Sequence, residues 1–465
     1  MARGKFQARR NPKRINWGGV LFIILTLIAL TLAAALVLRG CDYQENPPVT
    51  TDTSTAIPTT TDATTLATTS EPTTVPTTEP TEPYVVSTAS LGVTGDVLLH
   101  IPVINASYQG NGVYDFSEIF TYIAPYYQAF DFMVANLEVN VAGADRGYSG
   151  YPTFNAPDSI VDALKDAGVD MLLTANNHTY DMGKSGFQRT QEVLNEKGMP
   201  HLGTRLDEET PEFIIQSLND IQVGMACYTY ETGDTSDGRK TLNGIPVSSE
   251  DTNKVSSFNY KDLDNFYLEV ENTLAAMKAQ GAEATVVYLH WGDEYQLKPN
   301  SKQEEIAQAL CELGVDVIVG GHPHVIQPFE TLTSSTGHQT YCIYSIGNAI
   351  SNQRRTNISQ APDGHTEDSM IFSVVFEKWN DGSVKISEVN ILPIWVNKEW
   401  RNSVGNIYRI IPLDTAVEVW DSYDVSSINY TYGSYKRTMK IVGEGLNACR
   451  ETLGLPLMPM TANDD

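Results

Sequence analysis

The stretch that most strongly suggests chemistry is Gly320-Gly321-His322-Pro323-His324. It follows the apolar run from Val315 to Val319, which predicts a short buried strand after a helix that ends at Gly314. The two glycines permit a sharp turn, so both imidazoles can point into one space. Neutral imidazole is a common metal ligand, and two together indicate a divalent ion. The alternative is a pair of surface histidines without a metal.

Other polar residues follow apolar runs in the same way. The predicted strand 85–93 is followed by Asp96, and the predicted strand 132–135 by Asn136 and Glu138. The predicted strand 169–174 is followed by Asn176-Asn177-His178, and the predicted strand 284–289 by the stretch from His290 to Glu294. Helices predicted from 156 to 167, 186 to 197, 265 to 280 and 303 to 313 alternate with these strands. This alternation predicts an α/β fold with a largely parallel sheet covered by helices.

Ligands of such sheets bind beyond the carboxyl ends of the strands. We therefore expect one set of side chains to come together there, although each could also be an unrelated loop residue. The set is Asp96, Glu138, Asn177, His178, His290, His322 and His324. His100 is four residues after Asp96 and could approach the site, whereas the other three histidines are expected in loops or at the surface.

The rest of the chain carries weaker signals. The aromatic segment from Phe116 to Phe130 is expected to be helical, and 341–345 reads as a strand that leads to Gly347 and Asn348. Segments 370–376 and 383–396 predict a hairpin around Asn380-Asp381-Gly382. Residues 401–465 predict a helix near 434–453, and we assign this extension no function. The cysteines after Cys41 are spaced too widely for a metal or redox motif and are expected to be isolated thiols.

The first 83 residues predict an anchor and a spacer. A basic head at 1–17 precedes an uncharged apolar stretch at 18–38, which is long enough to span a bilayer. The positive-inside rule places the head in the cytoplasm and the rest of this single-pass chain outside the cell. A cleaved signal peptide is the rival, and lipidation of Cys41 is a further alternative. The Thr/Pro-rich stretch within 45–83 cannot bury a core and predicts a disordered linker before a domain at 84–400.

Charge and missing motifs exclude some functions. The net charge is −26, so nucleic acid is a poor partner for this chain. The sequence has no Gly-x-x-x-x-Gly-Lys-Ser/Thr loop, so any ATP-driven ligation would need a partner protein. A polyanion would be repelled unless a local cationic site, such as a metal centre, received it.

The ordered series of motifs resembles the CapA family of capsule-synthesis, or poly-γ-glutamate biosynthesis, proteins. It comprises Gly95-Asp96, Asn136-Leu137-Glu138, Ala175 to His178, His290 to Tyr295, Gly321 to His324 and Gly347-Asn348, across about residues 88–395. The family is related to calcineurin-like metallophosphoesterases. The resemblance therefore implies a metallophosphatase-like α/β/β/α sandwich, here preceded by one transmembrane helix.

The resemblance also implies roles for the site residues. Metal ligands would be Asp96, Glu138, Asn177, His290, His322 and His324, with His178 the catalytic histidine. Glu294 is a further catalytic candidate, which could orient His290 or act as a base. Asn136, Asn176 and Asn348 are expected near the site. The donor set favours Mn, Fe or Zn. Thr94 and Leu98 stand where ordinary metallophosphoesterases have an Asp-x-His pair around the first carboxylate.

The implied role is making or exporting poly-γ-glutamate at the cell membrane. The implied partners are the anionic polymer and other membrane-bound capsule synthesis proteins. A surface phosphoesterase or amide hydrolase, and a non-catalytic polymer-binding scaffold, are the alternatives.

Overall fold

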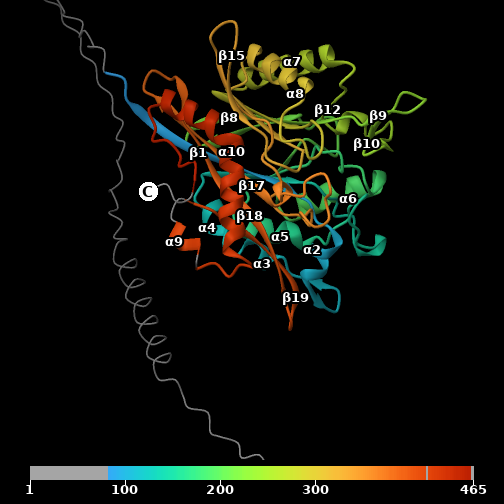
Figure 1. The fold of residues 1–465 in the computed structure, drawn as a ribbon. Coiled ribbons are helices and arrows are strands. Elements are labelled where there is room, and N and C mark those ends of the chain that lie inside the picture. Colours follow the sequence, from blue (N-terminus) through green and yellow to red (C-terminus); the bar gives the residue numbers. More distant parts are fainter. Residues whose placement is uncertain (1–81, 415–416, 421, 462–465) are drawn as a thin grey trace, which may run out of the picture. The chain divides into compact units, whose positions relative to one another are not determined.

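The fold is seen in a computed structural model that describes residues 82–414, 417–420 and 422–461. The predicted head, the predicted span 18–38, Cys41 and the predicted linker up to residue 81 lie outside these residues. Within the described part, two seven-stranded sheets carry most of the strands, and helices lie against them (Figure 1). The predicted mixed α/β class is confirmed. No helix among the described residues is long and apolar enough to cross a membrane.

The first sheet has the strand order β19-β18-β17-β1-β4-β5-β6. Its strands are β1 (Val85–Val97), β4 (Phe132–Leu137), β5 (Met171–Leu173), β6 (His201–Leu202), β17 (Asp368–Trp379), β18 (Val384–Arg401) and β19 (Gly405–Pro412). β1, β4, β5 and β6 are parallel, whereas β17, β18 and β19 are antiparallel to their neighbours. The predicted hairpin is therefore present as β17 and β18.

The second sheet has the order β12-β8-β13-β14-β16-β15, with β7 paired to β8. Its strands are β7 (Phe213–Leu218), β8 (Ile221–Tyr230), β12 (Ser257–Phe258), β13 (Ala284–His290), β14 (Val317–Gly321), β15 (Phe329–Thr333) and β16 (Gln339–Ile343). The helix–strand alternation predicted one parallel sheet, but the strands divide between two. Alternation is a local signal, and which sheet a strand joins depends on distant pairing.

The core lies between the two sheets and beneath the helices. In β13, Val286 and Tyr288 face the other sheet, whereas Val287 and Leu289 pack beneath helices. Successive side chains of a strand point to opposite faces, so a strand buried on both faces needs an unbroken apolar run. This explains why the 284–289 segment shows no polar alternation.

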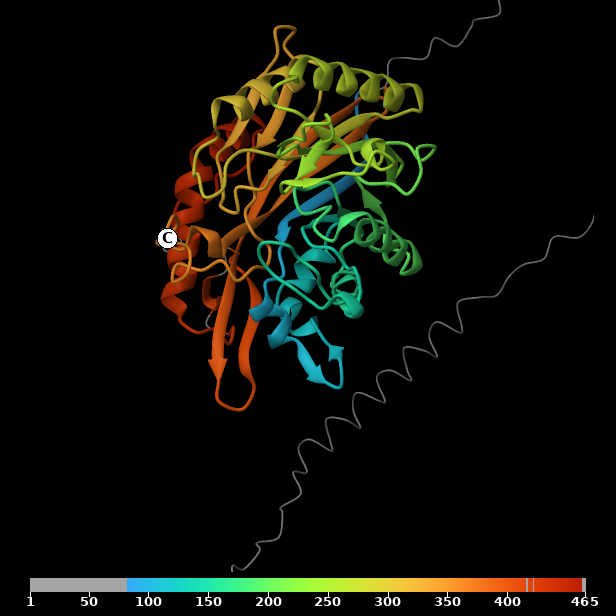
Figure 2. The same ribbon diagram turned by 90° about the vertical axis from the view of Figure 1, so that its right-hand side faces the viewer.

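Helices cover the outer faces of both sheets. Those over the first sheet are α2 (Ile101–Ala106), α3 (Ser117–Phe120), α4 (Ala124–Tyr127), α5 (Ser159–Asp166) and α6 (Gly183–Glu196). Those over the second are α7 (Leu263–Ala279) and α8 (Ser301–Glu312), drawn in yellow-green and yellow in Figure 2. The segment 116–130, which was expected to be helical, contains helices but not one continuous helix. α3 and α4 are two short helices, and Pro125 at the start of α4 has no N–H to continue a helix from before it.

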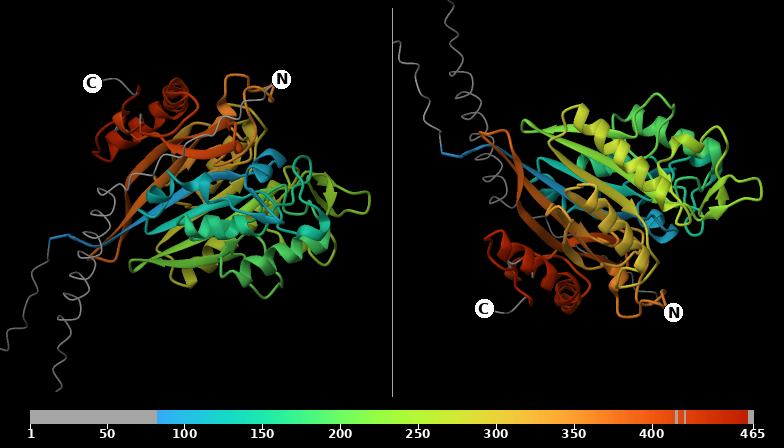
Figure 3. Two further views of the ribbon diagram at one scale, coloured as in Figure 1. Left: turned by 90° about the horizontal axis from the view of Figure 1, so that it is seen from below. Right: turned by 90° about the horizontal axis from the view of Figure 1, so that it is seen from above.

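The segment after residue 400 packs against both sheets. β19 extends the first sheet, and α10 (Ile428–Thr452), drawn in red, packs against β18 and β15 (Figures 1 and 3). Tyr435, Met439, Val442 and Leu446 of α10 join the core between the sheets. The smaller elements are β2 (Tyr108–Gly110), β3 (Val113–Tyr114), β9 (Gly233–Asp234), β10 (Lys240–Leu242), β11 (Ile245–Pro246), α9 (Val417–Trp420) and 3₁₀ turns at Ala144–Arg146, Thr252–Lys254 and His365–Glu367.

Candidate metal centre

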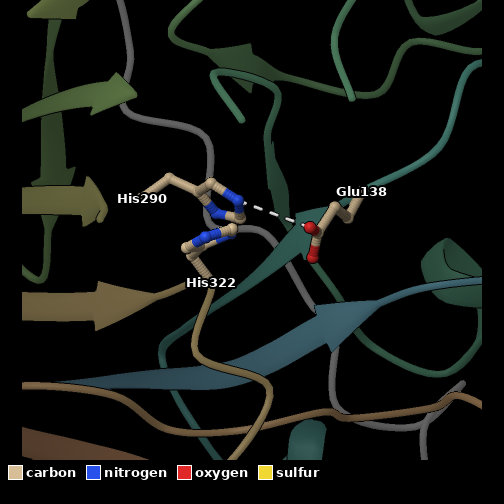
Figure 4. Close-up of side chains that lie close together, drawn as sticks. All are labelled: Glu138, His290 and His322. Carbon is tan, nitrogen blue, oxygen red and sulfur yellow. Dashed lines mark ion pairs between the residues drawn. The ribbon is translucent and has the colours of Figure 1, made fainter. Parts of the chain in front are cut away.

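The carboxyl ends of four strands meet at one edge of the two sheets. In the first sheet, Asp96 is the last residue but one of β1, and Glu138 directly follows β4. In the second sheet, β13 ends at His290, and His322 directly follows β14. Glu138, His290 and His322 point toward one another in Figure 4. Their ligand atoms lie within 4.8 Å of one another, as do those of Asp96, Glu138 and His324. Glu138 belongs to both groups.

Close backbone contact holds Asp96 in place. The Asp96 N–H donates to the carbonyl of Gly347 at 3.0 Å. A Cβ atom on Gly95 would lie 2.0 Å from that same carbonyl oxygen, so only glycine fits before Asp96. The Gly-Asp and Gly-Asn motifs of the sequence therefore form one contact between the end of β1 and the loop after β16, which aims the Asp96 carboxylate into the site.

The two histidines after β14 occupy an uncommon backbone conformation. His322 has φ 94° and His324 has φ 57°, both in the left-handed region that side-chain-bearing residues rarely adopt. Both side chains are buried, and the rings lie 5.8 Å apart. The strained turn brings both imidazoles to the same edge of the sheets, as the Gly-Gly-His-Pro-His stretch predicted.

Glu138 provides a test of whether a cation fits here. Its side chain is fully buried, and neither carboxylate oxygen has a hydrogen-bond partner among the described residues. Nδ1 of His322 is likewise buried without a partner. The Nε2 atoms of His290 and His324 approach Oε1 of Glu138 at 3.3 and 3.8 Å. Burying a carboxylate whose oxygens accept no hydrogen bond is costly unless a cation balances its charge. These orphaned atoms and the oxygen–nitrogen donor set fit a divalent metal ion.

The electrostatics of the cluster agree with that fit. Burial, and then the negative charges of Asp96 and Glu294, raise the pKa of Glu138 well above its usual value. Burial lowers the pKa of His290 to about 3 and that of His322 well below its usual value. Burial acts to raise the pKa of Asp96, but the hydrogen bond and charge of His324 outweigh it and lower that pKa. Neutral imidazoles beside a carboxylate are the forms that bind metal.

Three asparagines connect the cluster to its surroundings. The Asn177 Oδ1 atom lies 2.9 Å from Nε2 of His290. Asn136 donates to Asp96 Oδ1 at 2.7 Å, and Asn176 donates to Asn136 Oδ1 at 3.2 Å. Asn177 therefore reaches the ligand cluster directly. Asn136 orients the Asp96 carboxylate, and Asn176 holds Asn136 in place.

His178 lies beside the cluster and pairs with a carboxylate. Its Nδ1 atom is 2.8 Å from Oδ2 of Asp181, and both side chains are buried. Asn243, at the turn between β10 and β11, donates to Oδ1 of Asp181 at 2.9 Å. This pairing fixes the orientation of the His178 ring. The spacing His-x-x-Asp was visible in the sequence, but Asn243 is too distant in the chain to have been found.

The remaining predicted residues lie farther out. Glu294 is exposed at the rim, and the recorded contacts of His290 are with Asn136, Asn177 and Glu138 instead. Asn348 donates to the backbone carbonyl of His324 at 3.2 Å and so supports the turn. Tyr230, at the end of β8, was not predicted. Its hydroxyl lies 3.1 Å from Nε2 of His322.

Comparison with known proteins gives a consistent result. Residues 90–353 match the family described as "Bacterial capsule synthesis protein PGA_cap". "Capsule biosynthesis protein CapA" of Bacillus anthracis is 28% identical over 276 residues, which cover 57% of this chain and 62% of that protein. "PGA biosynthesis protein CapA" of Bacillus subtilis (strain 168) is 24% identical over 313 residues, covering 66% and 73%. The chain thus spans less than two thirds of the B. anthracis relative.

Two solved structures show a weaker likeness. The NAD nucleotidase NadN of Haemophilus influenzae aligns with a TM-score of 0.41 and 11% identity, over 77% of this chain and 68% of that one. The calcineurin-like phosphoesterase YfkN of Bacillus subtilis aligns with a TM-score of 0.40 and 16% identity, over 78% and 99%.

Proposed function

Because this chain belongs to the bacterial capsule synthesis family PGA_cap, we propose that it acts in making or exporting poly-γ-glutamate at the cell surface, through a divalent metal site. The names of the two Bacillus relatives, which are capsule and PGA biosynthesis proteins, support this role. The membrane anchor predicted at 18–38 and an extracellular site belong to the same proposal, as do membrane-bound partners. The fold would be metallophosphatase-like.

The single observation that best supports the metal site is Glu138, a fully buried carboxylate whose oxygens lack hydrogen-bond partners within the described part of the chain. In our proposal the ion is Mn, Fe or Zn, given the mixed carboxylate and imidazole donors. The ligands are Asp96, Glu138, Asn177, His290, His322 and His324. When bound, such an ion lowers the pKa of a water molecule and polarises an acyl or phosphoryl oxygen.

One specific observation favours a hydrolytic role for the same site. Asp181 holds Nδ1 of His178, which leaves Nε2 as the nitrogen that can give or take a proton. In this candidate function His178 protonates the leaving group, and Glu294 at the rim acts as a base. The substrate would be a phosphoester or a γ-amide bond of the glutamate polymer.

The test joins metal content to polymer output. The double variant His322→Ala/His324→Ala should lose bound metal in elemental analysis of the purified full-length protein, because it removes two imidazole ligands. Cells that carry it should make little or no capsule polymer. His338→Ala is the matched control, because His338 bonds the Val315 carbonyl away from the site. Full metal content in the double variant, or normal polymer without metal, would contradict the proposal.

A further inference from the structure

A positively charged patch of partly buried side chains lies where the loop after Ser351, β18 and α10 come together. Four cations gather there around two carboxylates: Arg354, Arg355, Lys398 and Arg437 with Glu367 and Asp368. Arg354 and Arg355 share Glu367 at 3.2 and 2.7 Å, and Arg437 pairs with Asp368 at 2.6 Å. The patch therefore keeps an excess of positive charge, although the chain carries a net −26.

Lys398 is the cation of this patch that is not paired with Glu367 or Asp368. It lies opposite Tyr408 of β19, and its ammonium is 5.3 Å from the centre of the Tyr408 ring. Nζ donates to Oδ1 of Asn352 at 2.8 Å, an oxygen that also accepts from the Tyr408 hydroxyl at 2.6 Å. Within residues 82–414, 417–420 and 422–461, Lys398 has no carboxylate at ion-pair distance. An ammonium has three donors, so this partly exposed side chain can still bind an anion.

Lys398 is connected to the metal centre through a short chain of contacts. The backbone N–H of Asn352 donates to Nδ1 of His100 at 3.3 Å. The His100 ring packs edge-on against Phe154 at 5.2 Å, and Phe154 packs in the same way against His178 at 4.7 Å. The patch and the proposed catalytic histidine therefore lie on either side of His100.

The sheet register gives the separation. Thr94 of β1 pairs with Ile371 of β17, which pairs with Leu392 of β18. Leu392 therefore lies level with Thr94, and the position level with Asp96 is two residues further along β18. Lys398 is six residues beyond Leu392, so it lies about four residues beyond the level of Asp96. With about 3.3 Å per residue and about 4.8 Å between strands, the Cα atoms of Asp96 and Lys398 are roughly 16 Å apart.

That distance suits a linear anionic chain. A γ-linked glutamyl unit has five backbone bonds and a free α-carboxylate, whereas an α-linked residue has three bonds and spans about 3.5 Å, so a γ-linked unit spans roughly 6 Å. Resting on the function proposed above, we propose that Lys398 binds an α-carboxylate of a γ-linked glutamyl chain, about three units from the unit held at the metal centre. The metal centre and Lys398 then form two subsites for one polymer.

The experiment compares short and long ligands on the purified full-length protein with excess Mn²⁺. Calorimetric titration would use a γ-glutamyl dimer, which cannot reach from the metal centre to Lys398, and an octamer, which can. Lys398→Gln should weaken octamer binding about 5- to 10-fold, the effect of losing a charge-assisted contact at a partly exposed site, and leave dimer binding unchanged. Lys398→Arg should restore most of the affinity, because it keeps the charge.

The matched control is Lys385→Gln. Lys385 lies on the same strand, and its ammonium sits 5.0 Å from the Trp379 ring centre, far from the site end of the sheet. Octamer affinity should be unchanged in this variant. An octamer affinity in Lys398→Gln equal to that of wild type, or an equal loss for dimer and octamer, would overturn the subsite.

Two further outcomes separate the possible failures. If wild-type protein binds metal but neither oligomer, the polymer function itself fails and takes the subsite with it. If Lys398→Gln loses affinity for inorganic tripolyphosphate but not for the octamer, the subsite binds phosphate and the carboxylate assignment is overturned.

Discussion

Replacing Glu138 by glutamine gives opposite effects with and without metal. The side chain is fully buried, and its carboxylate lies within 4.8 Å of ligand atoms of Asp96 and His324. In the metal-free protein, Glu138→Gln removes a buried negative charge next to Asp96 and should therefore stabilise the fold. In the metal-bound protein, the same change removes the ligand shared by both groups of three.

The size of the metal-free effect follows from the distance. Two unit charges at most 4.8 Å apart repel by at least about 3.5 kcal/mol at an effective dielectric constant of about 20. At about 2.1 cal/mol per kelvin per residue, the unit Glu79–Asp465 has an unfolding entropy near 0.8 kcal/mol per kelvin. Removing the repulsion should therefore raise Tm by about 4 °C.

The effect should depend on pH in a defined direction. The pKa of Glu138 is raised in the folded protein, so the folded state holds a proton that the unfolded chain releases. The stability of metal-free wild type should therefore fall, relative to Glu138→Gln, as pH rises from about 4.5 through the raised value. The variants should differ little near pH 4, and the difference should grow as the pH rises above about 4.5.

The assay is thermal unfolding in chelator and in excess Mn²⁺. An ion at about 100 times its Kd stabilises wild type by about 2.7 kcal/mol, and Glu138→Gln should gain much less. The matched control is Glu312→Gln at the exposed end of α8, which should respond to metal as wild type does. The reasoning is refuted if Glu138→Gln is less stable than wild type in chelator at pH 8, or gains equally from metal.

Two further predictions concern catalysis and packing. His178→Ala should keep its metal but lower polymer output by about 10²- to 10⁴-fold if the histidine transfers a proton, and unchanged output would favour the scaffold alternative. Gly320→Ala should destabilise the protein in urea unfolding by at least about 2 kcal/mol, because the new Cβ would lie 2.0 Å from the Tyr344 carbonyl oxygen. Gly433→Ala is the control and should not destabilise the protein, because its new Cβ would meet only the flexible end of the Arg437 side chain. Equal stabilities of the Gly320→Ala and Gly433→Ala proteins would contradict this prediction.

The sequence predicted the meeting of strand-end residues because that signal is local. Each of Asp96, Glu138 and His290 comes at or just after the end of an apolar run, and parallel strands bring such ends to one edge. No local signal predicts the division into two sheets. β4 and β13 are both largely apolar, and they join different sheets because they pair with different distant strands.

Contacts between distant segments were beyond sequence reasoning for the same reason. Asn243 reaches Asp181 from a turn that lies 62 residues later in the chain. Tyr230 ends β8, whose Gly224, Ala226 and Cys227 made its apolar run less distinct. Side chains of this kind are identified by tertiary structure, since neither spacing nor residue type marks them.

The position of β1 has a mechanical consequence. The chain enters the first sheet through this strand, which pairs with β17 from Val85 to Thr94 and with β4 from Leu91 to Val97. A pull on the N-terminal side, such as a tether would apply, acts along β1. It loads the β17 ladder first and then both ladders from Leu91 to Thr94. Asp96 lies at the far end of that strand. Both ladders therefore resist a pull before it displaces this carboxylate, so the site can keep its geometry while the chain bears load.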